Sequence, residues 1–205
     1  ETVMLFAEMD GVFRRKPDPV PENLTALREA VVKNGCDIGF AQDPDADRIG
    51  IVDGCGSALS EQYPLVLAVE HVLSKTSGPV VVNIQTSKAV GDVAAKYNCP
   101  LHLTAVGEIN VTTKMLQTGA VIGGEGGSGG IIYPAVHPCR DSFTGMALIL
   151  EMMAERAQIL TAILKDIPRY YSATAKVPCP MAKAVEIIRA LKEKYSGENP
   201  VAIDG

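Results

Sequence analysis

The chain has 205 residues, of which 47% are hydrophobic and 21% are charged, and its formal net charge is −5. These values are ordinary for a globular protein of one or two domains. The negative charge and the 5% of aromatic residues argue against a nucleic-acid-binding surface, which needs a basic stripe. No apolar run is long enough to suggest a membrane span. The five cysteines are widely spaced and form no Cys-x-x-Cys pair, which favours reduced thiols and a cytoplasmic location.

Helices and strands are expected to alternate along most of the chain. Apolar residues at helical spacing predict helices over 22–33, 61–75, 86–97, 110–117, 141–153 and 181–194. Short apolar runs predict strands over 38–41, 80–84, 101–106, 120–122, 170–177 and 201–203. This alternation predicts βαβ units, and hence an α/β fold with mixed, mostly parallel sheet layers flanked by helices on both faces. Pro168 marks a domain boundary.

An acidic segment directly follows the strand predicted over 38–41. It places Asp43, Asp45 and Asp47 at every second position, with Arg48 behind them. Three carboxylates this close repel one another unless a cation compensates them, and a cage made only of oxygen atoms suits Mg²⁺. We interpret the segment as a metal-binding loop in which Arg48 orients a phosphate beside the ion.

The acidic segment has three other interpretations. An EF-hand is excluded, because its sixth position should be Gly and is Arg48, and its twelfth should be Glu and is Gly54. A phosphatase of the haloacid-dehalogenase type, with Asp43 as nucleophile, also has an Asp-x-Asp after a buried strand, but it does not explain Asp47 and Arg48. A turn with solvated carboxylates is the structural alternative. The last two stay open at this point.

The second motif is a glycine-rich loop over residues 123–130, in which six of eight residues are glycine. Glycine lets a backbone approach a ligand closely, but the loop lacks the Lys-Ser/Thr ending of a P-loop. Glu125 and Ser128 within it suit the recognition of hydroxyl groups, as on a sugar. A flexible turn explains the glycine content equally well.

Other candidate residues follow predicted strands or begin predicted helices. Val106-Gly107-Glu108 follows one strand and Gln85-Thr86-Ser87 another, at carboxyl ends where ligands of α/β sheets gather. Each is also a plausible helix cap. Arg140 is a candidate phosphate contact, or simply part of an Arg140-Asp141 helix start. His71 is expected to be structural.

Together, these motifs resemble the α-D-phosphohexomutase superfamily of phosphoglucomutase, phosphomannomutase and phosphoglucosamine mutase. Asp43-Pro44-Asp45-Ala46-Asp47-Arg48 matches the family signature Asp-x-Asp-x-Asp-Arg, and Val106-Gly107-Glu108 and the glycine-rich loop follow at family-like separations. The resemblance covers essentially the whole chain. It implies three parts of a four-domain enzyme: residues 1–58 are the latter part of domain II, 59–168 are domain III, and 169–205 are the truncated start of domain IV.

The resemblance also implies roles for individual residues. Asp43, Asp45 and Asp47 would bind Mg²⁺, whose remaining ligand is a phosphoserine oxygen, and Arg48 would lie near the transferred phosphoryl group as the catalytic residue of this chain. The implied substrate-binding residues are Gly107, Gly124, Glu125, Ser128 and Arg140. The implied reaction interconverts hexose 1-phosphate and hexose 6-phosphate through a bisphosphorylated sugar.

The chain departs from the family pattern in three places. The phosphoserine loop of the Thr-Ala-Ser-His-Asn-Pro type and the Arg-x-Ser-x-Thr phosphate clamp of domain IV are not in these 205 residues. The loop Glu125-Gly126-Gly127-Ser128 is one residue longer than the usual Glu-x-Ser. We therefore expect an internal fragment that is inactive alone and whose partners are a hexose phosphate and the remaining domains of the polypeptide. The alternative is a non-catalytic sugar-phosphate-binding module.

Overall fold

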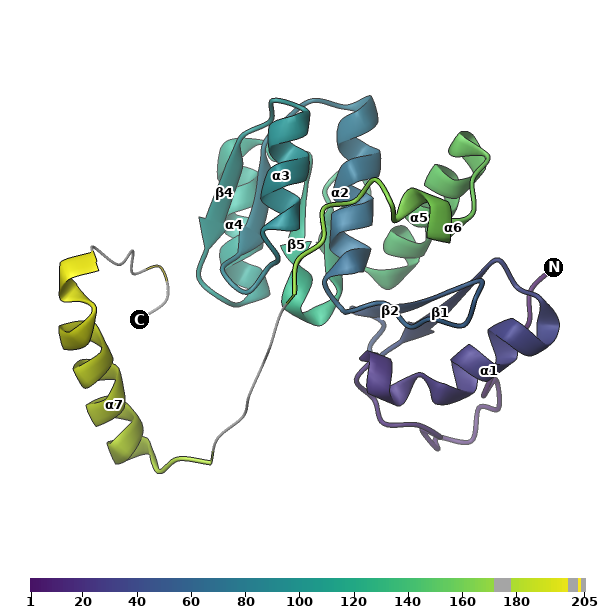
Figure 1. Cartoon of the computed structure of the whole chain (residues 1–205), viewed down its shortest axis with the longest axis horizontal. Coiled ribbons are helices and arrows are strands. Elements are labelled where there is room, and N and C mark those ends of the chain that lie inside the picture. Colours follow the sequence, from purple (N-terminus) through teal and green to yellow (C-terminus); the bar gives the residue numbers. More distant parts are fainter. Residues whose placement is uncertain (172–177, 199–202, 204–205) are drawn as a thin grey trace. The chain divides into compact units, whose positions relative to one another are not determined.

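The structure is a computed structural model that describes residues 1–171, 178–198 and 203 (Figure 1). The chain divides into two compact units, Glu1–Tyr170 and Tyr171–Gly205. The second unit contains helix α7 (Met181–Lys194), as predicted, and the short 3₁₀ helix η3 (Ser196–Glu198). Most of the two strands predicted over 170–177 and 201–203 lies outside the described residues.

The first unit begins with a helix packed on a β-hairpin. The 3₁₀ helix η1 (Pro21–Asn23) leads into α1 (Thr25–Asn34), which ends at Gly35 in the left-handed conformation, φ 63°. Strands β1 (Ile38–Gln42) and β2 (Ile49–Asp53) pair antiparallel, with Gln42 opposite Ile49. Strand β2 was not predicted. The acidic segment is therefore the connection of a hairpin, and its two ends are fixed by the strand pairing.

A five-stranded sheet forms the centre of the first unit. Its strands are β3 (Val80–Asn83), β4 (Leu101–Thr104), β5 (Ile122–Glu125), β6 (Gly130–Tyr133) and β7 (His137–Arg140), in the order β4-β3-β5-β6-β7. Strand β3 pairs parallel with β4 and β5, whereas the β5–β6 and β6–β7 pairs are antiparallel. The predicted α/β fold with a mixed sheet is confirmed. Strands β6 and β7 were not predicted.

Helices cover both faces of this sheet, because successive side chains of a strand point to opposite faces. On one face, Val80 and Val82 pack in the same core as α2 (Tyr63–Lys75), α3 (Ala89–Lys96) and α5 (Ser142–Arg156). On the other, Val81 packs against α4 (Glu108–Thr118). Figure 1 shows α2 and α3 side by side, with α4 across the sheet from them. The short helix α6 (Leu160–Ile163) was not predicted.

The arrangement brings the hairpin connection and the glycine-rich loop together. The amide N–H of Ile49, at the start of β2, donates to the carbonyl oxygen of Gly129 across 3.3 Å. Strands β3, β4 and β5 are parallel, so their carboxyl ends meet at one edge of the sheet, the place where α/β folds bind ligands. Among the described residues, no helix is long and apolar enough to cross a membrane.

Candidate functional site

The metal loop, residues 43–48, gathers three carboxylates. One oxygen from each of Asp43, Asp45 and Asp47 lies within 4.8 Å of the other two. The amide of Ala46 donates to the carbonyl oxygen of Asp43 across 3.2 Å, and Ala46 has a left-handed backbone with φ 58°. This tight turn points the alternate carboxylates toward one another. A cluster of oxygen ligands alone has the chemistry that Mg²⁺ and other hard cations require.

Arg48 anchors one of these carboxylates. Its backbone N–H donates to Asp43 Oδ1 across 3.1 Å, and its Nε donates to Asp43 Oδ2 across 2.6 Å. Asp43 is only 4% exposed. In contrast, Asp45 is exposed and makes no hydrogen bond or ion pair with any residue that the structure describes. One carboxylate of the cluster is thus fixed, and another has all of its lone pairs available.

The pKa values of the buried Asp43 and the partly buried Asp47 are shifted in opposite directions. Burial acts to raise the pKa of Asp43, but the hydrogen bonds from Arg48 outweigh it, so this pKa lies below its usual range. Burial also raises the pKa of Asp47, to about 6, together with the nearby Asp43 and Asp45 and against the charge of Arg140. The raised pKa of Asp47 therefore reflects burial first, with a smaller contribution from the two neighbouring carboxylates.

The glycine-rich loop is more ordered than its composition suggests. Strand β5 continues past its predicted end at Ile122 to Glu125, and the 3₁₀ turn η2 (Gly126–Ser128) then leads into β6. The Glu125 side chain is held at Oε1 by two donors, Nδ2 of Asn83 at 2.8 Å and the backbone N–H of Gly107 at 2.9 Å. The Ser128 hydroxyl donates to the Glu125 carbonyl across 3.1 Å. Glu125 and Ser128 therefore lie together in one ordered turn, and their role in sugar recognition stays a prediction.

Two glycines of this loop allow close backbone approach. A Cβ atom at Gly124 would lie 2.2 Å from the Gly130 carbonyl oxygen, and one at Gly129 would lie 2.6 Å from the Ile49 carbonyl oxygen. Gly129 also has φ 72°, which disfavours any side chain. Gly124 thus has a packing role in the β5–β6 hairpin, and its contact with a substrate stays a prediction.

Arg140, the last residue of β7, joins the two loops. Its guanidinium forms an ion pair with Asp47 of the metal loop, and its Nη1 donates to Glu125 Oε2 across 2.9 Å. The same nitrogen lies 3.4 Å from the Ser128 hydroxyl oxygen. Glu108 accepts from both the backbone N–H of Arg140, at 2.9 Å, and its Nε, at 3.0 Å. Arg140 is therefore at the centre of the predicted site.

The alternative interpretation of the Arg140-Asp141 pair, as the start of a helix, is correct for Asp141. Asp141 is the N-cap of α5, and its carboxylate accepts from the backbone N–H groups of Phe143 and Thr144. Thr86 and Ser87 likewise have local roles: the Thr86 hydroxyl accepts from the Gly126 N–H, at 3.0 Å, and Ser87 accepts from the Ala89 N–H. These hydroxyls orient backbone rather than face an open site.

Sequence reasoning missed two residues of the site. Asn83, the last residue of β3, is 2% exposed and holds Glu125. Ser142, the first residue of α5, bonds to the metal loop. The signal for Asn83 was present, because a polar residue directly after three valines ends an otherwise apolar strand. Nothing in the local sequence indicated Ser142.

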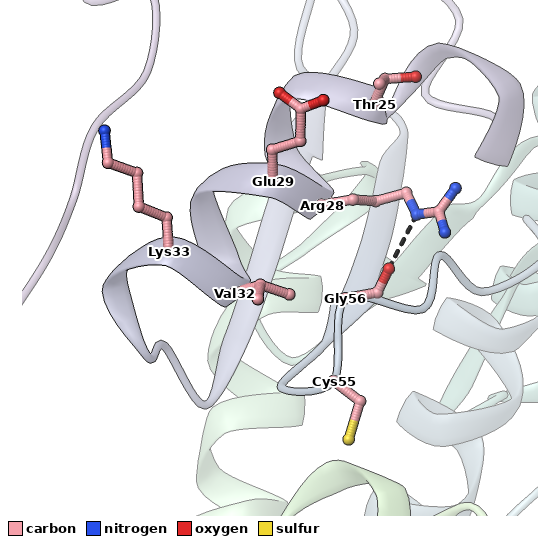
Figure 2. A pocket seen from close by; sticks show the side chains of 7 residues that line it. All are labelled: Thr25, Arg28, Glu29, Val32, Lys33, Cys55 and Gly56. Carbon is pink, nitrogen blue, oxygen red and sulfur yellow. Dashed lines mark hydrogen bonds between the residues drawn. The ribbon is translucent and has the colours of Figure 1, made fainter.

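A groove between α1 and the turn after β2 is a weaker candidate for a functional site. It is lined by Thr25, Arg28, Glu29, Val32, Lys33, Cys55 and Gly56, and none of these belongs to either loop (Figure 2). The Arg28 Nε donates to the Gly56 carbonyl across 2.8 Å, which ties α1 to the turn after β2. This contact explains the arginine as a structural residue.

Comparison with known proteins matches two family domains to the two halves of this site. The profile "Phosphoglucomutase/phosphomannomutase, alpha/beta/alpha domain III" matches residues 61–171, more than half of the chain. The chain belongs to the phosphoglucomutase/phosphomannomutase family. The profile of domain II of the same family matches residues 1–56, which contain the metal loop. The resemblance seen in the sequence motifs is confirmed.

Individual relatives agree with this assignment. A probable phosphoglucosamine mutase of Methanosarcina barkeri is 36% identical over 207 residues, covering 100% of this chain and 46% of the relative. A phosphoglucomutase/phosphomannomutase of Thermococcus kodakarensis is 33% identical over 86% of this chain and 39% of its own length. The chain thus spans less than half the length of these curated relatives.

A solved structure supports the fold independently. The family protein from Burkholderia thailandensis superposes with a TM-score of 0.68 at 28% identity, covering 77% of this chain and 35% of that one. The mixed sheet with helices on both faces is therefore the architecture of this family.

Proposed function

We propose that this chain is part of a Mg²⁺-dependent phosphohexomutase that interconverts hexose 1-phosphate and hexose 6-phosphate through a phosphoserine and a bisphosphorylated sugar. The observation that carries the proposal is the position of Arg140, which contacts both Asp47 of the metal loop and Glu125 of the glycine-rich loop. A cation site and a hydroxyl-recognition site are thereby one site, as transfer of a phosphoryl group to or from a sugar requires.

The metal loop fits Mg²⁺ in its donor set. Asp43, Asp45 and Asp47 offer only oxygen atoms, and the exposed Asp45 carboxylate has no competing partner among the described residues. When bound, the ion supplies charge neutralisation for a phosphoryl group in transfer. Asp43 accepts from the backbone N–H and Nε of Arg48, and Asp18 pairs with its Nη1, so Nη2 is the guanidinium nitrogen proposed to meet a phosphate oxygen.

The same geometry weighs against a phosphatase that uses Asp43 as its nucleophile. Both Asp43 oxygens accept hydrogen bonds from Arg48, and the residue is 4% exposed. An attacking oxygen needs an open path to the substrate, which a residue that is only 4% exposed does not have. The position suits an anchoring ligand rather than an attacking group.

Glu125 and Ser128 are the proposed sugar-binding residues. Glu125 is oriented by Asn83 and Gly107, which keeps its carboxylate ready to accept from sugar hydroxyls. Gly107 therefore acts through Glu125, because its N–H is already used. Arg140 supplies positive charge for a phosphate group of the substrate once it releases one of its carboxylate partners.

We further propose that the chain supplies the latter part of domain II (1–58), domain III (59–168) and the start of domain IV (169–205), and that the catalytic serine belongs to another part of the polypeptide. We expect no turnover of glucose 1-phosphate or mannose 1-phosphate by the 205-residue chain alone. Turnover by this pure chain would contradict the proposal.

The deciding experiment is to read the gene on both sides of Glu1 and Gly205 and to assay the complete product. A Ser-His-Asn-Pro-like loop upstream, with Mg²⁺-dependent mutase activity that Asp45→Ala abolishes and Glu29→Ala retains, would support the enzyme. Glu29 is a suitable control, because it is an exposed acid outside both loops. A reading frame without such a serine would instead indicate a non-catalytic sugar-phosphate-binding module.

A further inference from the structure

Ser142 bonds to the metal loop from the opposite half of the site. Its hydroxyl donates to the Ala46 carbonyl across 2.7 Å, and its backbone N–H donates to the same oxygen across 3.1 Å. The hydroxyl also accepts from Nε2 of Gln42 across 2.6 Å. Ser142 is 1% exposed. It therefore holds both the residue before Asp43 and the residue between Asp45 and Asp47.

The bonded carbonyl belongs to a residue in an unfavourable conformation. Ala46 has φ 58°, and the left-handed region is unfavourable for a residue with a Cβ atom, because that atom approaches the following carbonyl oxygen. In the same turn, three carboxylates are held within 4.8 Å of one another. Both the backbone strain and the charge repulsion favour a more open loop, so a contact from outside the loop is needed to keep the turn closed.

The start of α5 is well suited to make that contact. The first N–H groups of a helix have no partner within the helix. Asp141 accepts from those of Phe143 and Thr144, which leaves the N–H of Ser142 for the loop. A serine at this position adds a second donor directed at the same oxygen, and its small side chain fits a buried position.

We infer that Ser142 is a positioning residue for the metal loop, which fixes the left-handed turn at Ala46 and so holds Asp45 and Asp47 ready for a divalent cation. The inference rests on the proposed metal site. It also assigns a coupling role to Ser142, since this residue lies in the part matched to domain III and the metal loop lies in the part matched to domain II.

The test compares Mg²⁺ titrations of the ¹⁵N-labelled 205-residue chain and of Ser142→Ala, followed through the amide signals of Ala46 and Asp47. Losing one buried hydrogen bond should raise the Mg²⁺ dissociation constant about five- to tenfold. Before any metal is added, the Ala46 backbone coupling constant should also move away from the left-handed value.

The matched control is Ser87→Ala. Ser87 is likewise a hydroxyl at a helix start, where it accepts from the Ala89 N–H across 3.2 Å, but it does not contact the metal loop. It should leave the Mg²⁺ dissociation constant unchanged. Adding Ala46→Gly to Ser142→Ala should recover part of the lost affinity, because glycine adopts the left-handed turn without strain. If Ser142 only stabilised the fold, Ala46→Gly would not recover the lost Mg²⁺ affinity.

The outcomes separate the inference from the proposed function. If the original chain binds Mg²⁺ and Ser142→Ala binds it equally well with Ala46 unchanged, the inference is wrong and the metal site stands. If millimolar Mg²⁺ does not shift the loop signals of the original chain, the proposed metal site fails, and the inference fails with it. Should Ser142→Ala not fold, Gln42→Ala removes only the amide that orients the hydroxyl and is expected to weaken Mg²⁺ binding in the same direction.

Discussion

Two clusters of charged side chains in this chain have opposite balances of charge. In the first, here called the Glu70 cluster, Oε1 of the buried Glu70 accepts from Lys96 at 2.7 Å, Arg156 at 2.9 Å and Tyr97 at 3.0 Å. One carboxylate therefore meets two cations. In the metal loop, three carboxylates share Arg48 and Arg140 with other acids, and Asp45 has no partner among the described residues.

The two clusters differ in their balance of charge more than in their burial. In the Glu70 cluster the cations outnumber the carboxylate, whereas in the metal loop the carboxylates outnumber the cations. Glu70 is 1% exposed, yet its hydrogen bonds tie α2 to α3 and α5 and hold its pKa below the usual range, against the effect of burial. Such a satisfied buried group specifies packing. Among the described residues, the metal loop keeps an excess of negative charge, which a bound cation would offset.

The largest effect is expected from breaking the balanced cluster. Glu70→Gln should lower the free energy of unfolding by about 3 kcal/mol, because the buried Glu70 loses its charge and both of its ion pairs. This is the low end for a buried ion pair, since Lys96 is 52% exposed and can regain water. Urea denaturation monitored by circular dichroism measures this. Glu151→Gln is the control, since Glu151 is half exposed and pairs with Lys75 and His71, and it should cost less than about 1 kcal/mol. Equal losses would mean that Glu70 is not a structural centre.

Removing the arginine that serves both loops should have the next largest effect. Arg140→Ala leaves Asp47, Glu108 and Glu125 uncompensated and should cost about 2 kcal/mol without metal. Millimolar Mg²⁺ should return part of this stability, because it offsets the same negative charge. Arg28→Ala, which loses only a bond to a neutral carbonyl, should show no Mg²⁺-dependent recovery. Identical responses of the two variants would contradict a link between Arg140 and the metal loop.

The two clusters should also respond to pH with opposite signs. The lowered pKa of Glu70 means that its contribution is present above its ordinary value of 4.5 and is lost as the pH falls through the folded-state value. The pKa of Asp47 is raised from 3.8 to about 6, so the folded state binds a proton more tightly and stability declines as the pH rises between these values.

Denaturation of the metal-free chain at a series of pH values tests this difference. Asp47→Asn should remove the decline between pH 3.8 and about 6, worth about 1 kcal/mol after allowance for solvent screening. Glu70→Gln should instead flatten the loss of stability on the acid side of pH 4.5. A decline that persists unchanged in Asp47→Asn would assign it to another group.

The smallest effect should have the opposite sign. Asp45→Asn removes one of three mutually repelling charges and should stabilise the metal-free chain by about 0.5 kcal/mol, while it abolishes the Mg²⁺ response. Asp166→Asn, an exposed acid outside both loops, should change neither quantity. Destabilisation by Asp45→Asn would mean that the metal loop is already balanced without a cation.

Local features of the fold and site could be predicted from the sequence. The spacing of Asp43, Asp45 and Asp47 is enough to place their carboxylates together in a tight connection, and the glycines around Glu125 indicated a close backbone approach. Strand β3 was recognisable because three valines precede a polar residue, and β4 lies within the strand predicted over 101–106. The prediction over 120–122 shares only Ile122 with β5. These features depend on residues a few positions apart.

Features that join distant residues could not be predicted. Strands β6 and β7 have four residues each, one begins with Gly130 and the other contains Pro138, so their strand signals are weak. Without them, nothing places Arg140 beside Asp47 or Ser142 beside Ala46. The role of Glu70 was also missed. It is one of ten consecutive buried residues of α2, and a buried carboxylate needs partners, but the sequence does not show which residues these are.

The hydrogen bond from Ile49 to Gly129 has a consequence for how this family can diversify. It joins the metal loop to the glycine-rich loop through main-chain atoms alone. Substitutions at positions 127 and 128 would therefore leave this link intact, provided that position 129 remains glycine. A relative could differ in these two side chains and keep the same main-chain contact between the start of β2 and the glycine-rich loop.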